Sequence, residues 1–260
     1  MRVERYGSTS LLVSRISYGT GLTGPLRYKR TPAEGGRLFR YAHERGVNFW
    51  DTADGYRTHP HVAEGLQGLD RASVVINTKT GSKDYSSALA DVERFLRELR
   101  TEYIDIVLLH GVEKLEDFKS RRGALDALLE AKSRGWVRAV GLSSHLATGP
   151  IIEEVARSTE IEVLLTLYNP TGLMLHSGTI AEHSRLLEAV YRAGKGICLM
   201  KVLADGALAG SAEEAIRQAV AFPYAHSATI GFRDEHQIDM AVRIAQGESV
   251  APDLVAQAVG

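Results

Sequence analysis

Side chains that can exchange protons stand at the ends of three consecutive apolar runs of this chain. Asp51 and Tyr56 close the run VNFWDTADGY, Lys79 ends VVINTK, and His110 ends IDIVLLH. In parallel α/β folds, the residues after the carboxyl ends of strands face the mouth where ligands bind. If the three runs are neighbouring strands, a carboxylate, a phenol, an ammonium and an imidazole would meet at one place.

Tyr56 is the centre of the chemistry that this grouping suggests. A phenol has a pKa of about 10 and stays protonated at neutral pH, and a nearby lysine lowers that pKa by favouring the phenolate. Tyr56 would therefore be a usable general acid and base. Taken singly, each residue also has a structural interpretation, such as Asp51 capping the next turn or Lys79 reaching from a rim into water. We interpret the four residues as a site because their side chains would meet at one place.

Eight strand-like runs alternate with helix-like runs, after an opening in which residues 3–6 and 11–13 could form a hairpin. The strand candidates are Arg15–Thr20, Val47–Asp51, Val74–Lys79, Ile104–His110, Val137–Ser143, Val163–Tyr168, Gly196–Lys201 and Ser227–Phe232. Such alternation requires a parallel sheet with covered faces, and 260 residues are close to the roughly 250 of a closed barrel of eight units. We expect an α/β fold, a (β/α)8 TIM barrel with an N-terminal β-hairpin, as a single domain over residues 1–260. The competitor is an open doubly wound sheet, but no G-x-G-x-x-G follows the first strand.

Capping signals support the helical segments. Thr31 with Glu34, and Ser211 with Glu214, have the spacing of capping boxes. Gly46, Gly135 and Gly194 each stand just before a strand candidate, where a helix needs a left-handed residue to end.

Composition excludes several classes of function. The 31 basic and 32 acidic residues leave a net charge of -1, so we expect neither a nucleic-acid nor a membrane partner. The single cysteine, Cys198 in an apolar run, is interpreted as a buried core thiol. The segment His59-Pro60-His61 is interpreted as a surface loop, and no metal site is expected. Without a signal peptide or a long apolar run, the sequence predicts a soluble cytoplasmic protein, and it leaves the oligomeric state open.

In order and spacing, DTADGY, the lysine of INTK and the histidine of VLLH resemble the catalytic tetrad of the aldo-keto reductase superfamily. The resemblance extends through STSLLVSRISYGTG, TEYIDIVLLH and VRAVGLSSH, so it covers nearly the whole chain. It implies reduction of aldehyde or ketone carbonyls, with Tyr56 as general acid, Lys79 paired with Asp51 to lower the pKa of Tyr56, and His110 orienting the carbonyl. The implied partners are a small carbonyl substrate and NADPH, with NADH as the alternative.

The resemblance also implies a set of cofactor-binding positions. These are Gly19, Thr20, Asp51, Ser143, Asn169, Met200, Lys201, Gly231, Arg233 and Gln237. The cofactor side of the chain departs from the family pattern at these and neighbouring positions: Ser144 stands where the family usually has an asparagine, Leu165 where it has a glutamine, Met200 where it has an aromatic residue and Gln237 where it has an arginine. Arg233 could bind a 2′-phosphate or simply begin a solvated helix, so the preference for NADPH is a family default.

Three other functions remain open from the sequence alone. Lys79 or Lys201 could be the nucleophile of a Schiff-base lyase. Asp51, His110 and His145 could serve a metal-dependent hydrolase. A barrel of this kind could also be a nucleotide-binding or regulatory module without turnover.

The end of the chain suggests an accessible substrate site. Only residues 247–260 follow the eighth helical run, at 234–246, so we expect the long loop that narrows the pocket in many members of the family to be absent. From this we expect an open site with weak selectivity for substrate bulk.

Overall fold

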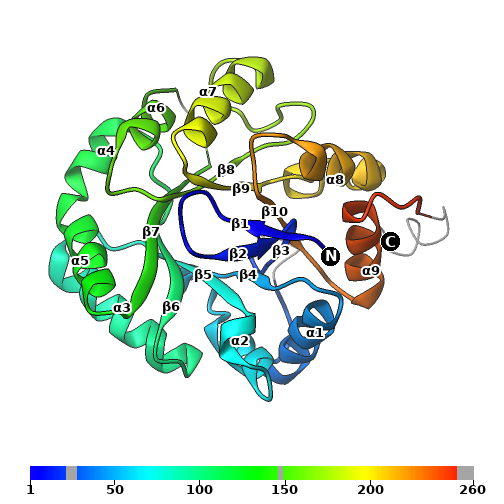
Figure 1. Cartoon of the computed structure of the whole chain (residues 1–260), viewed down its shortest axis with the longest axis horizontal. Helices are drawn as coiled ribbons and strands as arrows, with labels where there is room; N and C mark the ends of the chain where they lie inside the picture. The colour runs from blue at the N-terminus through cyan, green and yellow to red at the C-terminus, as the bar shows by residue number, and fades with distance from the viewer. Residues whose placement is uncertain (22–27, 146–148, 251–260) are drawn as a thin grey trace.

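Eight parallel strands close into a barrel in a computed structural model that describes residues 1–21, 28–145 and 149–250. Around the barrel the strand order is β10, β3, β4, β5, β6, β7, β8, β9, as Figure 1 shows from one end. The strands are β3 (Ile16–Gly19), β4 (Phe49–Asp51), β5 (Val75–Thr80), β6 (Ile104–Leu109), β7 (Val137–Ser144), β8 (Val163–Leu167), β9 (Gly196–Met200) and β10 (Ser227–Gly231). The predicted TIM barrel is confirmed, and the strand bounds differ from the sequence expectation by a few residues at most.

Helices surround the barrel on its outside (Figure 1). They are α1 (Pro32–Glu44), α2 (His59–Leu66), α3 (Tyr85–Leu99), α4 (Leu115–Ser120), α5 (Arg122–Ser133), α6 (Gly149–Arg157), α7 (Ile180–Arg192), α8 (Ala212–Ala221) and α9 (Glu235–Ala245). Their apolar stripes pack on the outer faces of the strands, and Val92 and Leu99 of α3 are fully buried there. The expectations of one domain and of an open site involve residues 251–260, which lie outside the described residues, so both stay predictions.

A hairpin closes the amino-terminal end of the barrel. It consists of β1 (Val3–Arg5) and β2 (Leu12–Ser14), which pair antiparallel and lie across the barrel axis in Figure 1. Tyr6 and Leu11 between these strands belong to the same apolar cluster as Phe49 and Cys198 inside the barrel. The predicted hairpin is confirmed, and Cys198 is the buried core thiol that the sequence predicted, with its pKa raised by burial. Because the hairpin covers this end, we expect a ligand to enter at the opposite mouth, at the carboxyl ends of the strands.

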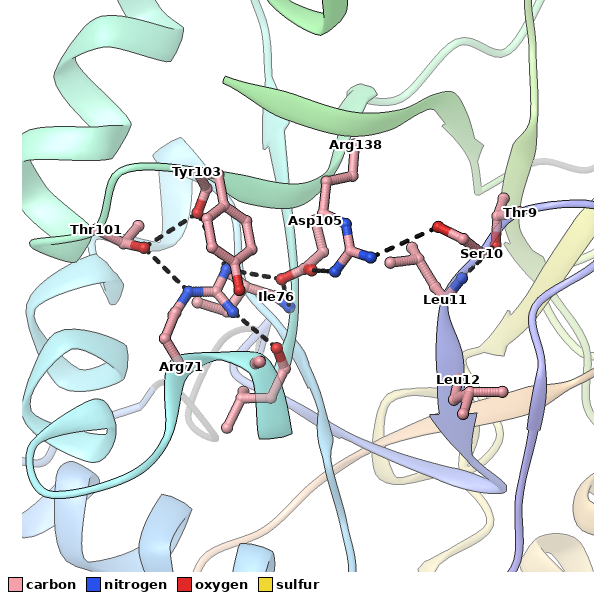
Figure 2. A network of polar contacts seen from close by, with 12 residues as sticks. Thr9, Ser10, Leu11, Leu12, Arg71, Ile76, Thr101, Tyr103, Asp105 and Arg138 are labelled. Atoms are coloured by element: carbon pink, nitrogen blue, oxygen red, sulfur yellow. Dashed lines mark hydrogen bonds and ion pairs between the residues drawn. The ribbon is translucent and has the colours of Figure 1, made fainter. Parts of the chain in front are cut away.

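A buried carboxylate ties the hairpin end of the barrel together. Asp105 of β6 accepts hydrogen bonds from Arg71 at 2.7 Å, Arg138 at 2.9 Å and the backbone of Ile76 at 3.0 Å, as Figure 2 shows. Arg138 also reaches the hydroxyl of Ser10 in the hairpin at 3.5 Å. Because a buried carboxylate needs this many partners, we interpret Asp105 as structural.

The helix ends follow the sequence expectations with one exception. Thr31 forms the predicted capping box with Glu34, and the three predicted glycines all have positive φ, between 77° and 85°. The capping box predicted at Ser211 is wrong: its side chain makes no cap bond, and its hydroxyl contacts the carbonyl of Leu208 at 3.4 Å. A 3-10 turn, η5 (Ala209–Ser211), runs directly into α8, so the Ser211 hydroxyl lies toward the carbonyl of Leu208 and not toward the first turn of α8.

The surface loop predicted at His59-Pro60-His61 is also wrong. These residues begin α2, with proline in its first turn, and both histidines are buried. His59 bonds to Glu98 and Thr78, whereas His61 bonds to the carbonyl of Arg30, so the two imidazoles do not share a centre. In the described part of the chain, no group of three or more His, Cys, Asp or Glu side chains is placed to hold a metal ion.

None of the helices among residues 1–21, 28–145 and 149–250 is long and apolar enough to cross a membrane.

Candidate active site

A short turn at the carboxyl end of β4 carries the predicted general acid. Asp51 is the last residue of β4, and Tyr56 ends the 3-10 turn η2 (Asp54–Tyr56). The hydroxyl of Thr58, just after this turn, lies 2.7 Å from those of Thr20 and Thr52. These buried contacts hold the turn against the ends of β3 and β4.

Lys79 and Asp51 form an ion pair beneath the turn. Lys79 Nζ lies 2.7 Å from Asp51 Oδ1 and 2.6 Å from the carbonyl oxygen of Thr52, and its side chain is fully buried. Asn77 donates a further bond to Asp51 Oδ1 at 2.5 Å. Burial lowers the pKa of Lys79, but the charge of Asp51 and its hydrogen bond to the amine contribute to a net rise, so the amine stays an ammonium.

The phenol of Tyr56 lies over this ammonium. Lys79 Nζ is 5.0 Å from the centre of the Tyr56 ring, within the range of a cation–π contact. Burial raises the pKa of Tyr56, Lys79 lowers it, and Asp51 and Asp205 raise it further, so that the pKa lies above its ordinary value. The lowering by Lys79 that the sequence predicted is present, but the expected net lowering is wrong because burial is the larger effect. In this state Tyr56 holds its proton firmly.

His110 stands beside Tyr56 as a neutral imidazole. The two rings meet edge to face, with centres 5.6 Å apart and planes at 86°. Burial lowers the pKa of His110 to about 3, and the charge of Lys79 acts in the same direction. A neutral imidazole has one N–H donor, so His110 can donate one hydrogen bond to a carbonyl oxygen at any pH near neutrality.

The low pKa of His110 predicts a loss of stability in acid. In unfolded chains histidine has a pKa of about 6.5, so between about 6.5 and 3 the unfolded chain binds a proton that the folded protein excludes. The free energy of unfolding should therefore fall as the pH drops through this window. His110→Gln should reduce that slope by up to one proton, measured by urea unfolding at several pH values. An unchanged slope would show that His110 is protonated in the folded protein.

His226 provides a control for the variant His110→Gln. Its pKa is lowered to about 4 by burial, and it lies at the hairpin end of the barrel, where it contacts Gly7. The variant His226→Gln should therefore change the same slope without changing the active site.

A cavity of about 370 Å³ opens at the carboxyl ends of the strands. Of the predicted site residues, those that line it are Gly19, Asp51, Tyr56, His110, Met200, Lys201, Gly231, Arg233 and Gln237. The phenol and the imidazole are thus exposed to one cavity whose wall continues past β9 and β10. The structure brings these predicted residues together.

Four predicted residues are buried behind the wall instead. Lys79 lies beneath Tyr56, and Thr20 bonds to the carbonyl oxygen of Asp51 and to Thr58. Ser143 accepts a bond from the backbone of Gly111 at 2.9 Å. The side chain of Asn169 bonds to several groups of its own loop, including the carbonyl oxygen of Leu173 at 2.8 Å. In this arrangement these side chains support the wall and do not form it.

Two glycines and a buried hydroxyl shape the cavity wall beside Tyr56. A Cβ added to Gly21 would lie 2.8 Å from the Tyr56 hydroxyl, and one added to Gly19 would lie 2.7 Å from Thr229 Oγ1. Glycine is therefore the residue that allows this close packing at both positions. Thr229 Oγ1 is buried and has no hydrogen-bond partner among the described residues. An unsatisfied hydroxyl in a cavity wall is suited to a polar group of a ligand.

Charged groups lie further along the same cavity. Lys201, with φ 60°, pairs with Asp205 at 2.7 Å on the loop after β9. Arg233 is exposed just before α9, and its backbone N–H donates to Gln237 Oε1 at 2.8 Å. The guanidinium of Arg233 makes no ion pair within the described part of the chain, so it remains available to an anionic group.

Sequence reasoning did not assign every residue of the wall to this site. His145 lines the cavity, with its ring centre 5.6 Å from that of His110, and Glu113 holds its Nδ1 at 3.1 Å. The sequence placed His145 at the end of a strand but named it only for the metal-dependent hydrolase, not for the reductase site. Nothing in the sequence marks Gly21 or Thr229, since their role depends on what faces them across the barrel.

Comparisons with known proteins agree with this geometry. The model of the Aldo/keto reductase family matches residues 15–223. A probable aldo-keto reductase of Glycine max is 30% identical over 156 residues, which are 54% of this chain and 44% of that protein. The NADH-specific methylglyoxal reductase of Escherichia coli K12 is 28% identical over 194 residues, 63% of this chain and 57% of that protein. The chain spans about half the length of the curated relatives it matches.

Solved structures show the same barrel. A putative aldo-keto reductase from Pseudomonas aeruginosa has a TM-score of 0.75 and 25% identity, covering 94% of this chain and 93% of that one. The holo form of an aldo-keto reductase from Bacillus halodurans has a TM-score of 0.77 over 100% of this chain and 95% of its own, but only 19% identity, so it supports the fold alone.

Proposed function

The chain belongs to the aldo/keto reductase family, and from this membership we propose that it is an NAD(P)H-dependent oxidoreductase that reduces aldehyde or ketone carbonyls to alcohols. The family consists of enzymes that reduce carbonyls with NAD(P)H. The observation that carries the proposal is the Tyr56 phenol on the cavity wall, with the Lys79–Asp51 ion pair beneath it and His110 beside it.

Each of the four residues has a role that follows from its surroundings. Tyr56 holds a proton in the resting state, so it can donate that proton to the oxygen of a carbonyl that is being reduced. Lys79 stays charged, so it can stabilise the phenolate that is left. Asp51 keeps Lys79 in place, and neutral His110 can hydrogen-bond the carbonyl oxygen and orient it.

The polar groups along the cavity suit a dinucleotide. A bound nicotinamide would supply the hydride that adds to the carbonyl carbon. We assign the nicotinamide end to the wall at Gly19 and Gly21 and to the hydroxyl of Thr229, which has no hydrogen-bond partner in the described part of the chain. Lys201 and Arg233 are suited to phosphate groups, because Arg offers a planar fork of donors and Lys a compact charge.

The preference between NADPH and NADH depends on Arg233. A guanidinium without an ion pair among the described residues, close to the cavity, favours a 2′-phosphate and hence NADPH. The Escherichia coli relative is NADH-specific by name, and the matched family segment ends at residue 223, before both Arg233 and Gln237. We propose NADPH as the preferred cofactor and NADH as a weaker alternative.

Cofactor titration followed by turnover tests this proposal. Wild-type protein should bind NADPH and NADH, measured by nucleotide fluorescence, and should oxidise the bound nucleotide when small aldehydes or ketones are added. Arg233→Met should weaken NADPH about ten-fold, roughly the strength of one charge-assisted hydrogen bond, and should leave NADH within two-fold. Lys29→Met, a lysine that does not line the cavity, is the matched control.

Two results would count against the proposal. Binding of both nucleotides without turnover of any carbonyl would favour the binding-module alternative. Equal weakening of NADPH and NADH in Arg233→Met would contradict a 2′-phosphate contact.

The Schiff-base alternative has no support from the site geometry. A nucleophilic lysine needs a neutral amine, but Lys79 is held as an ammonium by Asp51, and Lys201 is paired with Asp205.

A further inference from the structure

A network of charged side chains lies behind the active site, on the outside of the barrel. It involves α2 and α3, none of its side chains lines the cavity, and the proposed reaction assigns it no role. Its members are Asp54, His59, Thr78, Thr80, Asp91, Arg94 and Glu98.

Arg94 of α3 is the hub of this network. It contacts Asp54 at 2.7 Å, Asp91 at 2.7 Å and Glu98 at 3.1 Å. Asp54 begins the turn that ends at Tyr56, so this contact ties the turn to α3. One guanidinium with three carboxylates has a fixed geometry, since its donors lie in one plane.

The network also reaches the strand that carries Lys79, by two routes. Asp91 accepts a bond from the hydroxyl of Thr80 at 2.5 Å. Glu98 lies 2.6 Å from His59 Nδ1, and His59 Nε2 lies 2.7 Å from Thr78 Oγ1. Thr78 and Thr80 are the neighbours of Lys79 on β5. The Tyr56 turn and the Lys79 strand are therefore fastened to the same residue.

We propose that Arg94 and His59 are positioning residues that set the separation between the Tyr56 phenol and the Lys79 ammonium. The inference rests on the proposed function, because it assigns these residues to the proton transfer of that reaction. They act through Asp54 on one side and through Thr78 and Thr80 on the other.

The separation matters because the effect of Lys79 on Tyr56 depends on distance. The interaction of two charges falls as the separation grows, and Lys79 is the largest influence that opposes the burial of the phenol. The next largest influences on the pKa of Tyr56 are the charges of Asp51 in β4 and Asp205 in η4 (Ala204–Gly206). The neutral His110 ring contacts the phenol from the end of β6. Arg94 is not among the largest influences on the pKa of the phenol, so we expect it to act mainly through position.

The ion pairs of Arg94 are partly exposed to solvent, which limits their contribution to the stability of the fold. The side chains of Arg94, Asp54 and Glu98 are each between 35% and 37% exposed, and isolated pairs of that kind stabilise proteins little. His59, only 1% exposed, anchors the network in the protein interior. We therefore expect loss of Arg94 to change the site more than it changes the stability of the fold.

The test replaces Arg94 with Met, a side chain of similar length without charge. Arg94→Met should lower kcat about ten-fold, since small displacements of reacting groups are costly, and the basic limb of the kcat profile should move to higher pH. The Kd for NADPH should stay within two-fold, because Arg94 does not line the cavity. Arg94→Lys should recover part of kcat, since its ammonium can still pair with one or two of the carboxylates.

Arg97→Met is the matched control, on the same helix and exposed to solvent. It should change neither kcat nor the pH profile. His59→Gln, which keeps a donor toward Glu98 or Thr78, should give a smaller loss than His59→Leu. Thermal unfolding of each variant identifies any that fail to fold.

A second readout separates this inference from the proposed function. The pKa of Tyr56 can be followed by carbon NMR of labelled tyrosine, with the signal assigned by its absence in Tyr56→Phe. Arg94→Met should raise that pKa whether or not the protein reduces carbonyls. If Arg94→Met lowers only the melting temperature, or changes nothing, and the pKa of Tyr56 stays at the wild-type value, the positioning role is wrong.

Discussion

Tyr56→Phe should lower kcat for carbonyl reduction by about 10²- to 10⁴-fold, the usual contribution of a general acid. The substitution removes only the hydroxyl, and the ring should keep its edge contact with His110 and its place over Lys79. The Kd for NADPH, measured by fluorescence titration, should therefore remain close to the wild-type value. Steady-state kinetics with an aldehyde that the wild-type protein reduces provide the measurement.

Tyr85→Phe is the control for this prediction. Tyr85 is 42% exposed at the start of α3 and does not line the cavity, so its variant should match the wild type. More than about a tenth of wild-type kcat in Tyr56→Phe would remove the phenol from the proton transfer. A large loss of NADPH affinity would show instead that the hydroxyl serves binding.

Lys79→Met should lower both activity and stability. It leaves the carboxylate of Asp51, which is 4% exposed, without its ammonium partner. Breaking a buried pair by removing one partner costs about 3 to 5 kcal/mol, and the free energy of unfolding, measured by urea denaturation, should fall by that amount. Turnover should fall at least as far as in Tyr56→Phe, because no charge remains to stabilise the phenolate.

The double variant Asp51→Asn with Lys79→Met separates the two effects. Without the carboxylate no charge is left buried, so most of the lost stability should return while activity stays low. Lys132→Met is the control, because Lys132 pairs with Glu162 at the surface and its loss should cost at most about 1 kcal/mol. Recovery of turnover in the double variant would contradict the role of Lys79.

The sequence by itself was sufficient to predict the barrel, the hairpin and the family. Alternating apolar and amphipathic runs leave few arrangements for eight strands, because parallel strands need helical crossovers on the outside. The four acid–base residues could be listed as well, since each follows the end of a strand and all such ends meet at one mouth. Local signals such as the Thr31 cap and the glycine at position 46 depend only on neighbouring residues, so they too could be read from the chain.

Tertiary structure decided whatever depends on residues distant in the chain. The pKa of Tyr56 is set by how deeply the phenol is buried, and the sequence carries no measure of burial. His59 looked like part of a loop because its partners, Thr78 and Glu98, are 19 and 39 residues away. The contact of Thr229 with Gly19, and the links from Arg94 to the Tyr56 turn and to β5, also join residues that are far apart in the chain. Periodicity and caps are local and can be predicted, whereas burial and contacts across the barrel exist only once the chain has closed.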